Sequence, residues 1–460
     1  MSSTARPRDP SALSEIFKAY DVRGLVPEQL DESLARAVGG AFVRVTGAAG
    51  GSIVVGHDMR PSSPAMARAF AEGAATAGAD VEMIGLASTD QLYYASGTRG
   101  VPGAMFTASH NPAQYNGIKM CREHAKPVGM ETGLAEIRDL VASGEPIEGE
   151  RVGEITESDV LADYARHLRS LVPVKGRRLT VVVDAGNGMA GYTAPAVFEG
   201  IDIEVVPMYF ELDGTFPNHE ANPIDPENLR DLQAEVRQTG ADIGLAFDGD
   251  ADRCFLVDER GELVNPSLLT ALIAARELGQ EPGAAIIHNL ITSRAVPEIV
   301  RELGGTPVRT RVGHSFIKAK MAETGAVFGG EHSGHFYFRD FWRADSGMLA
   351  ALHALAALAA GDLPLSQLLE KYSRFVGSGE INSTVADQAA VLRLLEEEYA
   401  GTAGVSVDHL DGLTVSCDEW WFNVRASNTE PLLRLNAEAR DEATMARIRD
   451  EVLATIRRDS

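Results

Sequence analysis

Short apolar runs separated by polar, glycine-rich loops recur along most of the chain. Many runs are rich in β-branched residues, and Ala-rich segments with helical spacing follow them, which is typical of α/β units with parallel or mixed sheets. We expect strands at residues 52–56, 80–86 and 103–107, then at 179–184, 201–208 and 241–247, and then at 284–289, 306–311 and 326–330. Each group of strands leads into polar loops, so the pattern predicts three α/β modules that share a cleft.

The pattern changes after about residue 371. Strands are expected at 413–417, 421–425 and 432–437, before an amphipathic helix over 442–456. Clusters of polar, Gly and Pro residues mark the boundaries between regions. The expected domains are α/β domain I over residues 1–153, α/β domain II over 154–260, α/β domain III over 261–372 and a smaller α+β domain IV over 373–460.

Composition narrows the classes of partner. With 460 residues and 45% hydrophobic positions, the chain can form several domains, each with its own core. The net charge of −24 argues against nucleic-acid and anionic-membrane partners, and no protein partner is predicted. Three scattered cysteines and the lack of an apolar leader or spanning segment predict a cytoplasmic protein.

A polar loop follows the strand expected at 103–107 and contains Thr107-Ala108-Ser109-His110-Asn111-Pro112. Ser109 lies at a strand-to-loop turn, where its hydroxyl can meet a substrate. Ser, Asn and Pro also form ordinary turns, so this segment alone does not distinguish a nucleophile from a turn.

A second loop, Asp248-Gly249-Asp250-Ala251-Asp252-Arg253, places carboxylates at alternate positions. Their repulsion favours a hard divalent cation such as Mg²⁺, although a solvated turn is the simpler alternative. A calcium EF-hand is a further alternative, because Glu259 is the twelfth residue counted from Asp248. Arg253 occupies the position at which that motif needs Gly, and a strand rather than a helix is expected before the loop.

Two later loops carry groups suited to sugars and phosphates. Gly330-Glu331-His332-Ser333-Gly334-His335 offers a carboxylate, hydroxyl and imidazoles to sugar hydroxyls. Arg425-Ala426-Ser427-Asn428-Thr429-Glu430-Pro431 combines a guanidinium with hydroxyl and amide donors, as a phosphate site requires. Each loop can also be purely structural.

Taken in order, these motifs resemble the α-D-phosphohexomutase family, and within it the bacterial phosphomannomutase/phosphoglucomutase branch. The other segments that carry the resemblance are Lys18-Ala19-Tyr20-Asp21-Val22-Arg23-Gly24, Tyr115-Asn116-Gly117-Ile118-Lys119 and Val312-Gly313-His314-Ser315. The resemblance covers nearly the whole chain. It implies three related α/β domains with mixed sheets and a smaller C-terminal α+β domain around a central cleft.

The resemblance also implies the role of each site residue. Ser109 is the phosphorylated residue, and domains I to IV carry the phosphoserine, metal, sugar-recognition and phosphate-clamp loops in that order. The implied metal ligands are Ser109, Asp248, Asp250 and Asp252. The other implied catalytic residues are His110, Lys119, Arg253 and His335. The implied substrate-binding residues are Tyr20, Arg23, His314, Glu331, Ser333, Arg425, Ser427, Asn428 and Thr429.

The implied reaction is the reversible interconversion of hexose 1-phosphate and hexose 6-phosphate. It needs Mg²⁺ and a hexose 1,6-bisphosphate activator, with phosphomannomutase activity expected first and phosphoglucomutase activity left open. Residues 289–294 lack a Lys that some relatives have, and Arg294 or His314 is a candidate replacement. A phosphoglucosamine mutase, a Ser-dependent sugar phosphatase and a non-catalytic sugar-phosphate sensor are the alternatives.

Overall fold

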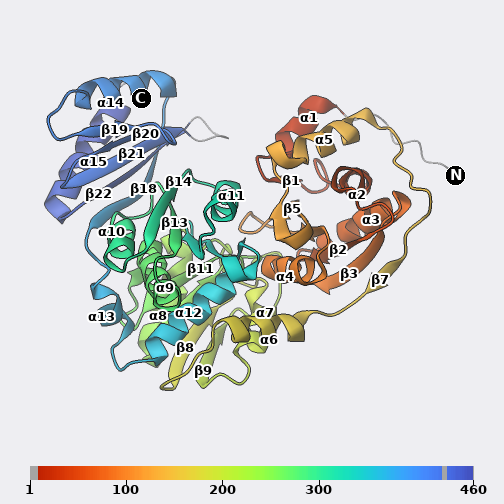
Figure 1. Cartoon of the computed structure of the whole chain (residues 1–460), viewed down its shortest axis with the longest axis horizontal. Coiled ribbons are helices and arrows are strands. Elements are labelled where there is room, and N and C mark those ends of the chain that lie inside the picture. Colours follow the sequence, from red (N-terminus) through yellow and green to blue (C-terminus); the bar gives the residue numbers. More distant parts are fainter. Residues whose placement is uncertain (1–8, 427–431, 459–460) are drawn as a thin grey trace. The chain divides into compact units, whose positions relative to one another are not determined.

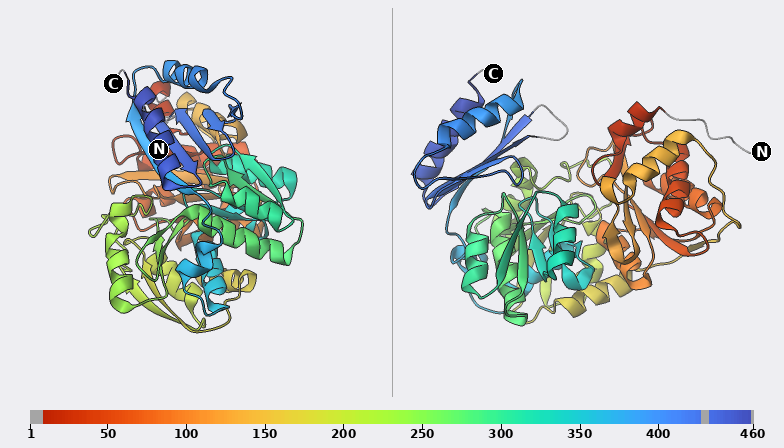
Figure 2. Two further views of the ribbon diagram at one scale, coloured as in Figure 1. Left: turned by 90° about the vertical axis from the view of Figure 1, so that its left-hand side faces the viewer. Right: turned by 45° about the horizontal axis from the view of Figure 1, so that its top comes forward.

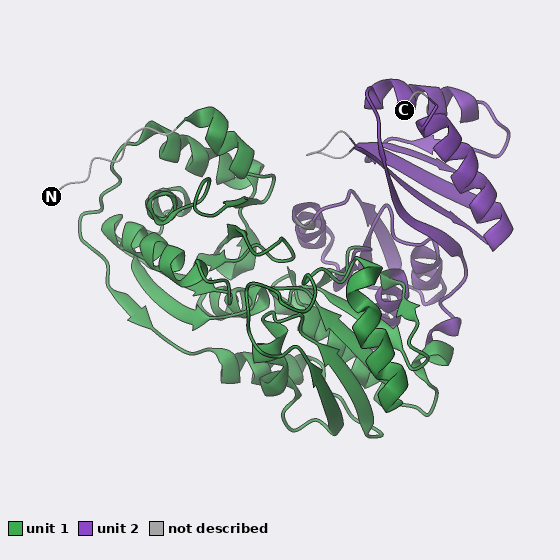
Figure 3. Cartoon of the chain, turned by 180° about the vertical axis from the view of Figure 1, so that it is seen from behind, with its two compact units in different colours: residues 1–266, 333–368 green, residues 267–332, 369–460 purple. Residues whose placement is uncertain are grey.

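A computed structural model of the chain describes residues 9–426 and 432–458 (Figure 1). The fold consists of two compact units (Figure 3). Unit 1 contains the described part of Met1–Pro266 together with Ser333–Leu368. Unit 2 contains Ser267–His332 and the described part of Leu369–Ser460, so each unit is assembled from two stretches of sequence.

The first sheet of unit 1 is mixed and has the strand order β1-β5-β4-β2-β3-β7, with β6 paired to β5. β2 runs parallel to β3 and β4, whereas β5 runs antiparallel to β4 and β1. The strands are β1 (Asp21–Leu25), β2 (Ser52–His57), β3 (Asp80–Leu86), β4 (Gly103–Phe106), β5 (Tyr115–Arg122), β6 (Lys126–Pro127) and β7 (Ile155–Glu157). The helices are α1 (Pro10–Ile16), α2 (Glu32–Thr46), α3 (Ser63–Thr76), α4 (Thr89–Arg99) and α5 (Leu134–Ser143).

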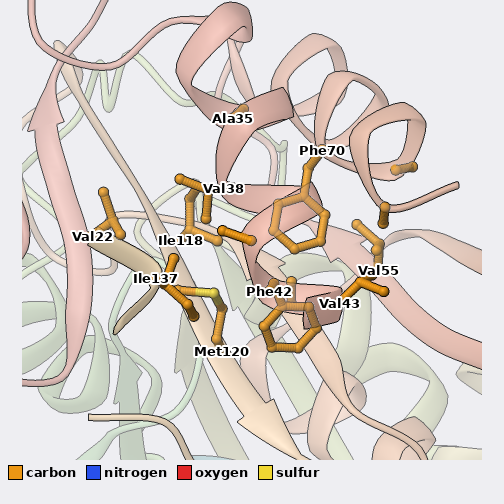
Figure 4. Packing of buried hydrophobic residues seen from close by; sticks show 14 of the residues in the cluster. Val22, Ala35, Val38, Phe42, Val43, Val55, Phe70, Ile118, Met120 and Ile137 are labelled. Carbon is orange, nitrogen blue, oxygen red and sulfur yellow. The ribbon is translucent and has the colours of Figure 1, made fainter. Parts of the chain in front are cut away.

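Helices cover both faces of this sheet. Alternate residues of a strand point to opposite faces, so each face presents apolar side chains on which helices can pack. Val55 of β2 packs in the cluster formed by α2 and α3, where the rings of Phe42 and Phe70 lie 5.6 Å apart (Figure 4). Val54 packs instead in a second cluster, with Leu92 of α4. Since β2 and β4 are parallel, the loops that follow them lie at the same edge of the sheet.

Local signals in the sequence set the ends of these helices. Asp31 caps α2 by accepting a hydrogen bond from the backbone N–H of Leu34 at 2.7 Å. The helix ends at Gly47, whose φ of 71° lies in the left-handed region. Ser88 and Gln91 form a capping box at the start of α4, so the turn before α4 has a defined conformation.

The second sheet of unit 1 has the order β12-β11-β10-β8-β9. β8 is parallel to β9 and β10, and β11 is antiparallel to β10 and β12. The strands are β8 (Leu179–Asp184), β9 (Ile203–Met208), β10 (Ile243–Phe247), β11 (Cys254–Asp258) and β12 (Leu263–Val264), with helices α6 (Leu161–Leu171), α7 (Ala190–Phe198) and α8 (Arg230–Thr239). The later stretch of unit 1 adds the antiparallel pair β16 (Phe336–Phe338) and β17 (Ala344–Asp345) and helix α12 (Gly347–Ala359).

The first strands of unit 2 are parallel: β13 runs parallel to both β14 and β15. These strands are β13 (Ala285–Asn289), β14 (Thr306–Thr310) and β15 (Phe328–Gly330), with helices α9 (Pro266–Gln280), α10 (Ala295–Glu302) and α11 (His314–Thr324). A separate helix, α13, covers Leu365–Glu370.

The C-terminal part of unit 2 is an antiparallel sheet in the order β18-β22-β21-β20-β19. Two helices cover one face of it (Figure 2), where Leu395 and Val452 join the buried cluster of the strands. The elements are β18 (Val376–Thr384), β19 (Ser406–Asp408), β20 (Leu413–Ser416), β21 (Trp420–Ala426) and β22 (Leu432–Ala439), with α14 (Gln388–Tyr399) and α15 (Glu442–Ile456).

The expected fold class is confirmed, since α/β sheets in three successive regions precede a smaller C-terminal region with an antiparallel sheet. Within residues 9–426 and 432–458, no helix combines the length and apolarity that crossing a bilayer requires.

Helices α2 and α3 approach each other backbone to backbone, which gives a matched pair of variants. A Cβ at Gly39 would lie 2.1 Å from the carbonyl oxygen of Phe70, whereas a Cβ at Gly40 would have no neighbour closer than 3.6 Å. We expect Gly39→Ala to destabilise unit 1 by about 1–3 kcal/mol through overpacking. Gly40→Ala should be neutral or stabilising by up to about 1 kcal/mol through helix propensity. Urea unfolding followed by circular dichroism measures both, and equal midpoints would contradict the close approach of these helices.

Candidate active site

Ser109 lies in the loop between β4 and β5, in a conformation that is unusual for a residue with a side chain. Its φ is 49°, which costs on the order of 1–3 kcal/mol and is often found at functional sites. The backbone N–H of Ser109 donates to Oγ1 of Thr107 at 2.9 Å. The Ser109 hydroxyl donates to Oδ2 of Asp248 at 2.6 Å, although 139 residues separate the two in the sequence. The serine loop and the acidic loop therefore meet within unit 1.

The acidic loop connects the antiparallel strands β10 and β11, and its three carboxylates are all buried. Asp248, Asp250 and Asp252 each offer an oxygen, and these oxygens all lie within 4.8 Å of one another. Lys119 of β5 contacts two of them, with Nζ 2.7 Å from Asp250 and 2.5 Å from Asp252. Nε of Arg253 donates to Asp248 at 3.0 Å. Two cations thus face three carboxyl groups, one cation fewer than full ionisation of the triad would require.

This imbalance is reflected in the pKa values of the site. Burial raises the pKa of Asp248 to about 8, although the Arg253 guanidinium opposes the shift. Burial also acts to raise the pKa of Asp250, but Lys119 outweighs it and lowers the pKa. Burial acts to lower the pKa of Lys119, yet Asp250 and Asp252 hold it well above its ordinary value. Lys119 is therefore a cation, and Asp248 carries a negative charge less readily than Asp250.

The oxygen atoms of this cluster fit a divalent metal ion. Oδ1 of Asp250 and Oδ1 of Asp252 are buried, and neither accepts a hydrogen bond from any residue that the structure describes. Buried carboxylate oxygens are costly without a partner. Oxygen-only ligands suit a hard cation, and the same carboxylates can hold one next to Ser109.

Thr89 was not predicted from the sequence, although it contacts the acidic loop directly. Its hydroxyl donates to Oδ2 of Asp250 at 2.6 Å, and its backbone N–H donates to the Asp250 carbonyl at 3.1 Å. Thr89 is the first residue of α4, directly after the capping residue Ser88. The sequence alone could have indicated the helix cap at Ser88, but it could not have indicated the contact between Thr89 and Asp250.

His110 and Arg253 flank the Ser109 hydroxyl. Nδ1 of His110 lies 3.2 Å from Oγ of Ser109, and Nη2 of Arg253 lies 3.3 Å from the same atom. The positive charge of Arg253, together with burial and Arg23, lowers the pKa of His110 well below its ordinary value. His110 is thus a neutral imidazole, and Arg253 supplies the positive charge beside the hydroxyl.

His335 also lies against the acidic loop. Its Nε2 is 3.5 Å from Oδ1 of Asp252 and 3.9 Å from Oδ2 of Asp345, and its Nδ1 is 3.0 Å from Oγ of Ser333. His335 also forms an isolated β-bridge with Arg253. Asp345 was not predicted from the sequence; it lies in β17 and is brought next to His335 by the fold.

Arg23, one of the predicted N-terminal residues, contacts the serine loop. Nη1 of Arg23 donates to Oδ1 of Asn111 at 2.6 Å, and its Nη2 pairs with Asp21 at 2.5 Å. Arg23 is part of β1, which pairs with β5 so that Asp21 lies opposite Lys119. Tyr20 is half-buried immediately before β1.

The remaining predicted residues belong to unit 2. Oε1 of Glu331 accepts a hydrogen bond from the backbone N–H of Gly313 at 3.0 Å, and Glu331 is buried. Arg425 pairs with Glu380 at 2.8 Å. The predicted phosphate-loop residues Ser427, Asn428 and Thr429 lie outside the described residues, as does the side chain of His314.

Arg294, considered from the sequence as a replacement for the missing Lys, contacts the C-terminal sheet. Its Nη1 donates to the Cys417 carbonyl at 2.5 Å, and its guanidinium lies over the ring of Phe375 at 5.8 Å. Its backbone N–H donates to Glu438 at 3.0 Å. The guanidinium therefore joins two parts of unit 2.

The arrangement in unit 1 combines the groups needed for phosphoryl transfer. Ser109 offers a hydroxyl nucleophile, the three aspartates can hold a metal ion, and Arg253 and Lys119 can offset negative charge. His110 and His335 place imidazole nitrogens beside the Ser109 hydroxyl and the acidic loop.

Models of all four domains of the phosphoglucomutase/phosphomannomutase family match the chain. The matches cover residues 14–148 for alpha/beta/alpha domain I, 162–261 for domain II, 265–375 for domain III and 380–455 for the C-terminal domain.

Relatives match over nearly the full chain. A protein of Xanthomonas campestris pv. campestris named "Phosphohexose mutases" is 41% identical over 447 residues, which cover 96% of this chain and 99% of that protein. A phosphomannomutase of Escherichia coli is 39% identical over 453 residues, with 96% and 99% covered. The crystal structure of a phosphoglucomutase/phosphomannomutase family protein from Burkholderia thailandensis has a TM-score of 0.88 and 34% identity, with 97% of this chain and 98% of that chain covered. The chain therefore belongs to the phosphoglucomutase/phosphomannomutase family and is a phosphohexomutase, an intramolecular phosphotransferase.

Proposed function

We propose that the chain interconverts mannose 1-phosphate and mannose 6-phosphate through a phosphoserine at Ser109, and that glucose phosphates are also accepted. The observation that carries the proposal is the 2.6 Å hydrogen bond from the Ser109 hydroxyl to Asp248 of the acidic triad. It places the hydroxyl beside a candidate metal site and 3.3 Å from the Arg253 guanidinium. A hexose 1,6-bisphosphate is both the proposed intermediate and the proposed activator.

In the proposed reaction, phosphoserine transfers its phosphoryl group to the free hydroxyl of a hexose monophosphate. The bond from phosphorus to Oγ of Ser109 breaks as a bond to the sugar oxygen forms. The bisphosphate then turns round and returns its other phosphoryl group to Ser109. Arg253 offsets the charge on the transferred group, and positioning by the loops supplies much of the remaining acceleration.

Protons must move in each transfer. The attacking sugar hydroxyl loses a proton, and Oγ of Ser109 gains one when its phosphoryl group leaves. We assign these tasks to His335 and Lys119, with His110 as the neutral partner of the Ser109 oxygen. Lys119, held as a cation by Asp250 and Asp252, offsets negative charge, and because its pKa is raised it can give its proton only to a strongly basic oxygen such as the departing Oγ of Ser109.

The proposed cation is Mg²⁺, with Asp248, Asp250, Asp252 and a phosphoserine oxygen as its ligands. When bound, it would neutralise phosphoryl charge. Its positive charge would also favour the ionised form of Asp248, whose pKa burial raises.

We further propose that each of four domains contributes a different part of the active site. These domains cover residues 1–153, 154–260, 261–372 and 373–460. The first two carry the phosphoserine and the metal loop. The third binds the sugar through Glu331 and Ser333, and His314 is a further proposed substrate-binding residue. The fourth clamps the distal phosphate through Arg425, Ser427, Asn428 and Thr429, while Tyr20 and Arg23 line the site.

The proposal is tested by ³¹P NMR of mannose 1-phosphate with the protein, Mg²⁺ and a trace of hexose 1,6-bisphosphate. We expect the mannose 6-phosphate signal to grow, and Ser109→Ala to slow its growth by more than about 10³-fold because the nucleophile is lost. Ser170→Ala is the control, since that exposed hydroxyl only donates to a carbonyl of its own helix.

Three other spectra would each contradict part of the proposal. Growth of inorganic phosphate alone would indicate a phosphatase. Turnover confined to glucosamine phosphates, tested in parallel, would replace the substrate. Undiminished turnover by Ser109→Ala would exclude the phosphoserine.

The metal site is tested separately with Thr89→Val, which removes the hydroxyl that orients Asp250. We expect the affinity for Mg²⁺ to fall about tenfold, as is typical when a group that orients a metal ligand is lost. Isothermal titration calorimetry with Mg²⁺ measures this change. Thr98→Val on the same helix removes a hydroxyl that donates only to helix carbonyls, and it should bind like the wild type. Identical affinities for the two variants would mean that Thr89 does not shape the metal site.

A further inference from the structure

Arg60 lies three residues after the end of β2, and its side chain is fully buried. A buried guanidinium is uncommon, because a charge is costly to remove from water unless its N–H groups find partners. The sequence assigned it no role. Its partners show what it does in the fold.

The guanidinium of Arg60 donates to four backbone carbonyls of the serine loop. Nη1 donates to Pro112 and Tyr115, both at 2.9 Å. Nη2 donates to Ser109 at 2.9 Å and to Asn111 at 2.7 Å. All four acceptors belong to segment 109–115, which comprises most of the loop after β4 and the first residue of β5. A single planar group thus fixes the path of this loop.

Groups on its other sides hold Arg60 in place. Oδ2 of Asp58 lies 3.3 Å from Nε, and Oδ1 of Asp58 accepts from the Arg60 backbone N–H at 2.9 Å and from Ser63 at 2.6 Å. The ring of Phe216, which follows the second sheet's β9, lies 5.1 Å from the guanidinium carbon. Burial between a carboxylate and an aromatic face leaves Arg60 little freedom to change rotamer.

Arg60 binds main-chain oxygens and not the Ser109 hydroxyl. Its contacts are therefore available both when Oγ carries a hydrogen and when it carries a phosphoryl group. The hydrogen bond from Oγ to Asp248 exists only in the first of these states, because a phosphoserine oxygen has no proton to donate there. The loop thus needs a restraint that does not depend on the state of Oγ, and Ser109 adopts a left-handed φ of 49° within it.

We propose that Arg60 is a positioning residue, which holds Ser109 in one orientation through both halves of the reaction cycle. This inference rests on the proposed phosphoserine mechanism. It predicts that Arg60 affects the rate of phosphoryl transfer and leaves the binding of the sugar phosphate unchanged, because the Nη1 and Nη2 groups of its guanidinium donate to the loop that carries the nucleophile.

The test compares Arg60→Lys and Arg60→Ala with the wild type in the isomerisation of mannose 1-phosphate. We expect kcat to fall about 10–100-fold and KM to stay within about twofold, since a shift of the nucleophile by a fraction of an ångström costs rate and not affinity. Millimolar guanidinium should restore part of the activity of Arg60→Ala, whereas sodium chloride at the same ionic strength should not.

Arg169→Lys is the matched control, because Arg169 also donates to backbone carbonyls, those of Ala196 and Val197 in α7. It should retain the wild-type kcat. Thermal unfolding of each variant separates loss of folding from loss of rate. If Arg60→Ala does not fold, Asp58→Asn replaces it, since that nearly isosteric change weakens the hold on Nε and should lower kcat with KM unchanged.

Hydrogen–deuterium exchange provides a readout that does not depend on the proposed reaction. The amides of residues 107–117 should exchange faster in Arg60→Lys than in the wild type, while the rest of the chain exchanges equally. An inactive wild type with this local effect would refute the proposed function and support the loop restraint. An active wild type whose kcat equals that of Arg60→Lys, or a rise in KM without a fall in kcat, would overturn the inference.

Discussion

Three carboxylates buried in one short loop impose the constraint on which unit 1 depends. Like charges at this separation repel strongly in a medium of low dielectric constant, so they need cations close by. Arg253 comes from the same loop, but Lys119 comes from β5 of the other sheet. The register of β5 positions this ammonium group, and α4 positions Thr89. Elements of both sheets of unit 1 therefore contribute to stabilising the buried carboxylates.

The sequence could predict the parts of the site that are contiguous in the chain. The serine loop and the acidic loop each follow an apolar strand, and hydrophobic runs reveal such strands. The strands expected at 103–107 and 241–247 correspond to β4 and β10. β18 was missed, because its residues are mostly exposed and include Gly and Ser, so it has neither a run nor an alternation of apolar residues.

What the sequence could not predict are contacts between distant segments. Thr89 and Asp250 are 161 residues apart, and nothing near Thr89 in the sequence suggests an acidic partner. Asp345 and Arg60 also look ordinary in their own segments. Their roles follow from the sheet order, which places separate loops at one edge, and pairing order is a property of the fold rather than of any one segment.

The four carbonyls that accept hydrogen bonds from Arg60 also affect which positions of the loop tolerate substitution. Every amino acid carries a main-chain carbonyl, so the hydrogen bonds that hold segment 109–115 do not depend on the identity of its side chains. The exposed side chains of this segment, those of Ala113 and Gln114, can therefore be replaced without loss of these four hydrogen bonds, whereas Ser109 and His110 remain tied to the site. A change at either exposed position would leave the backbone path around Ser109 unaltered.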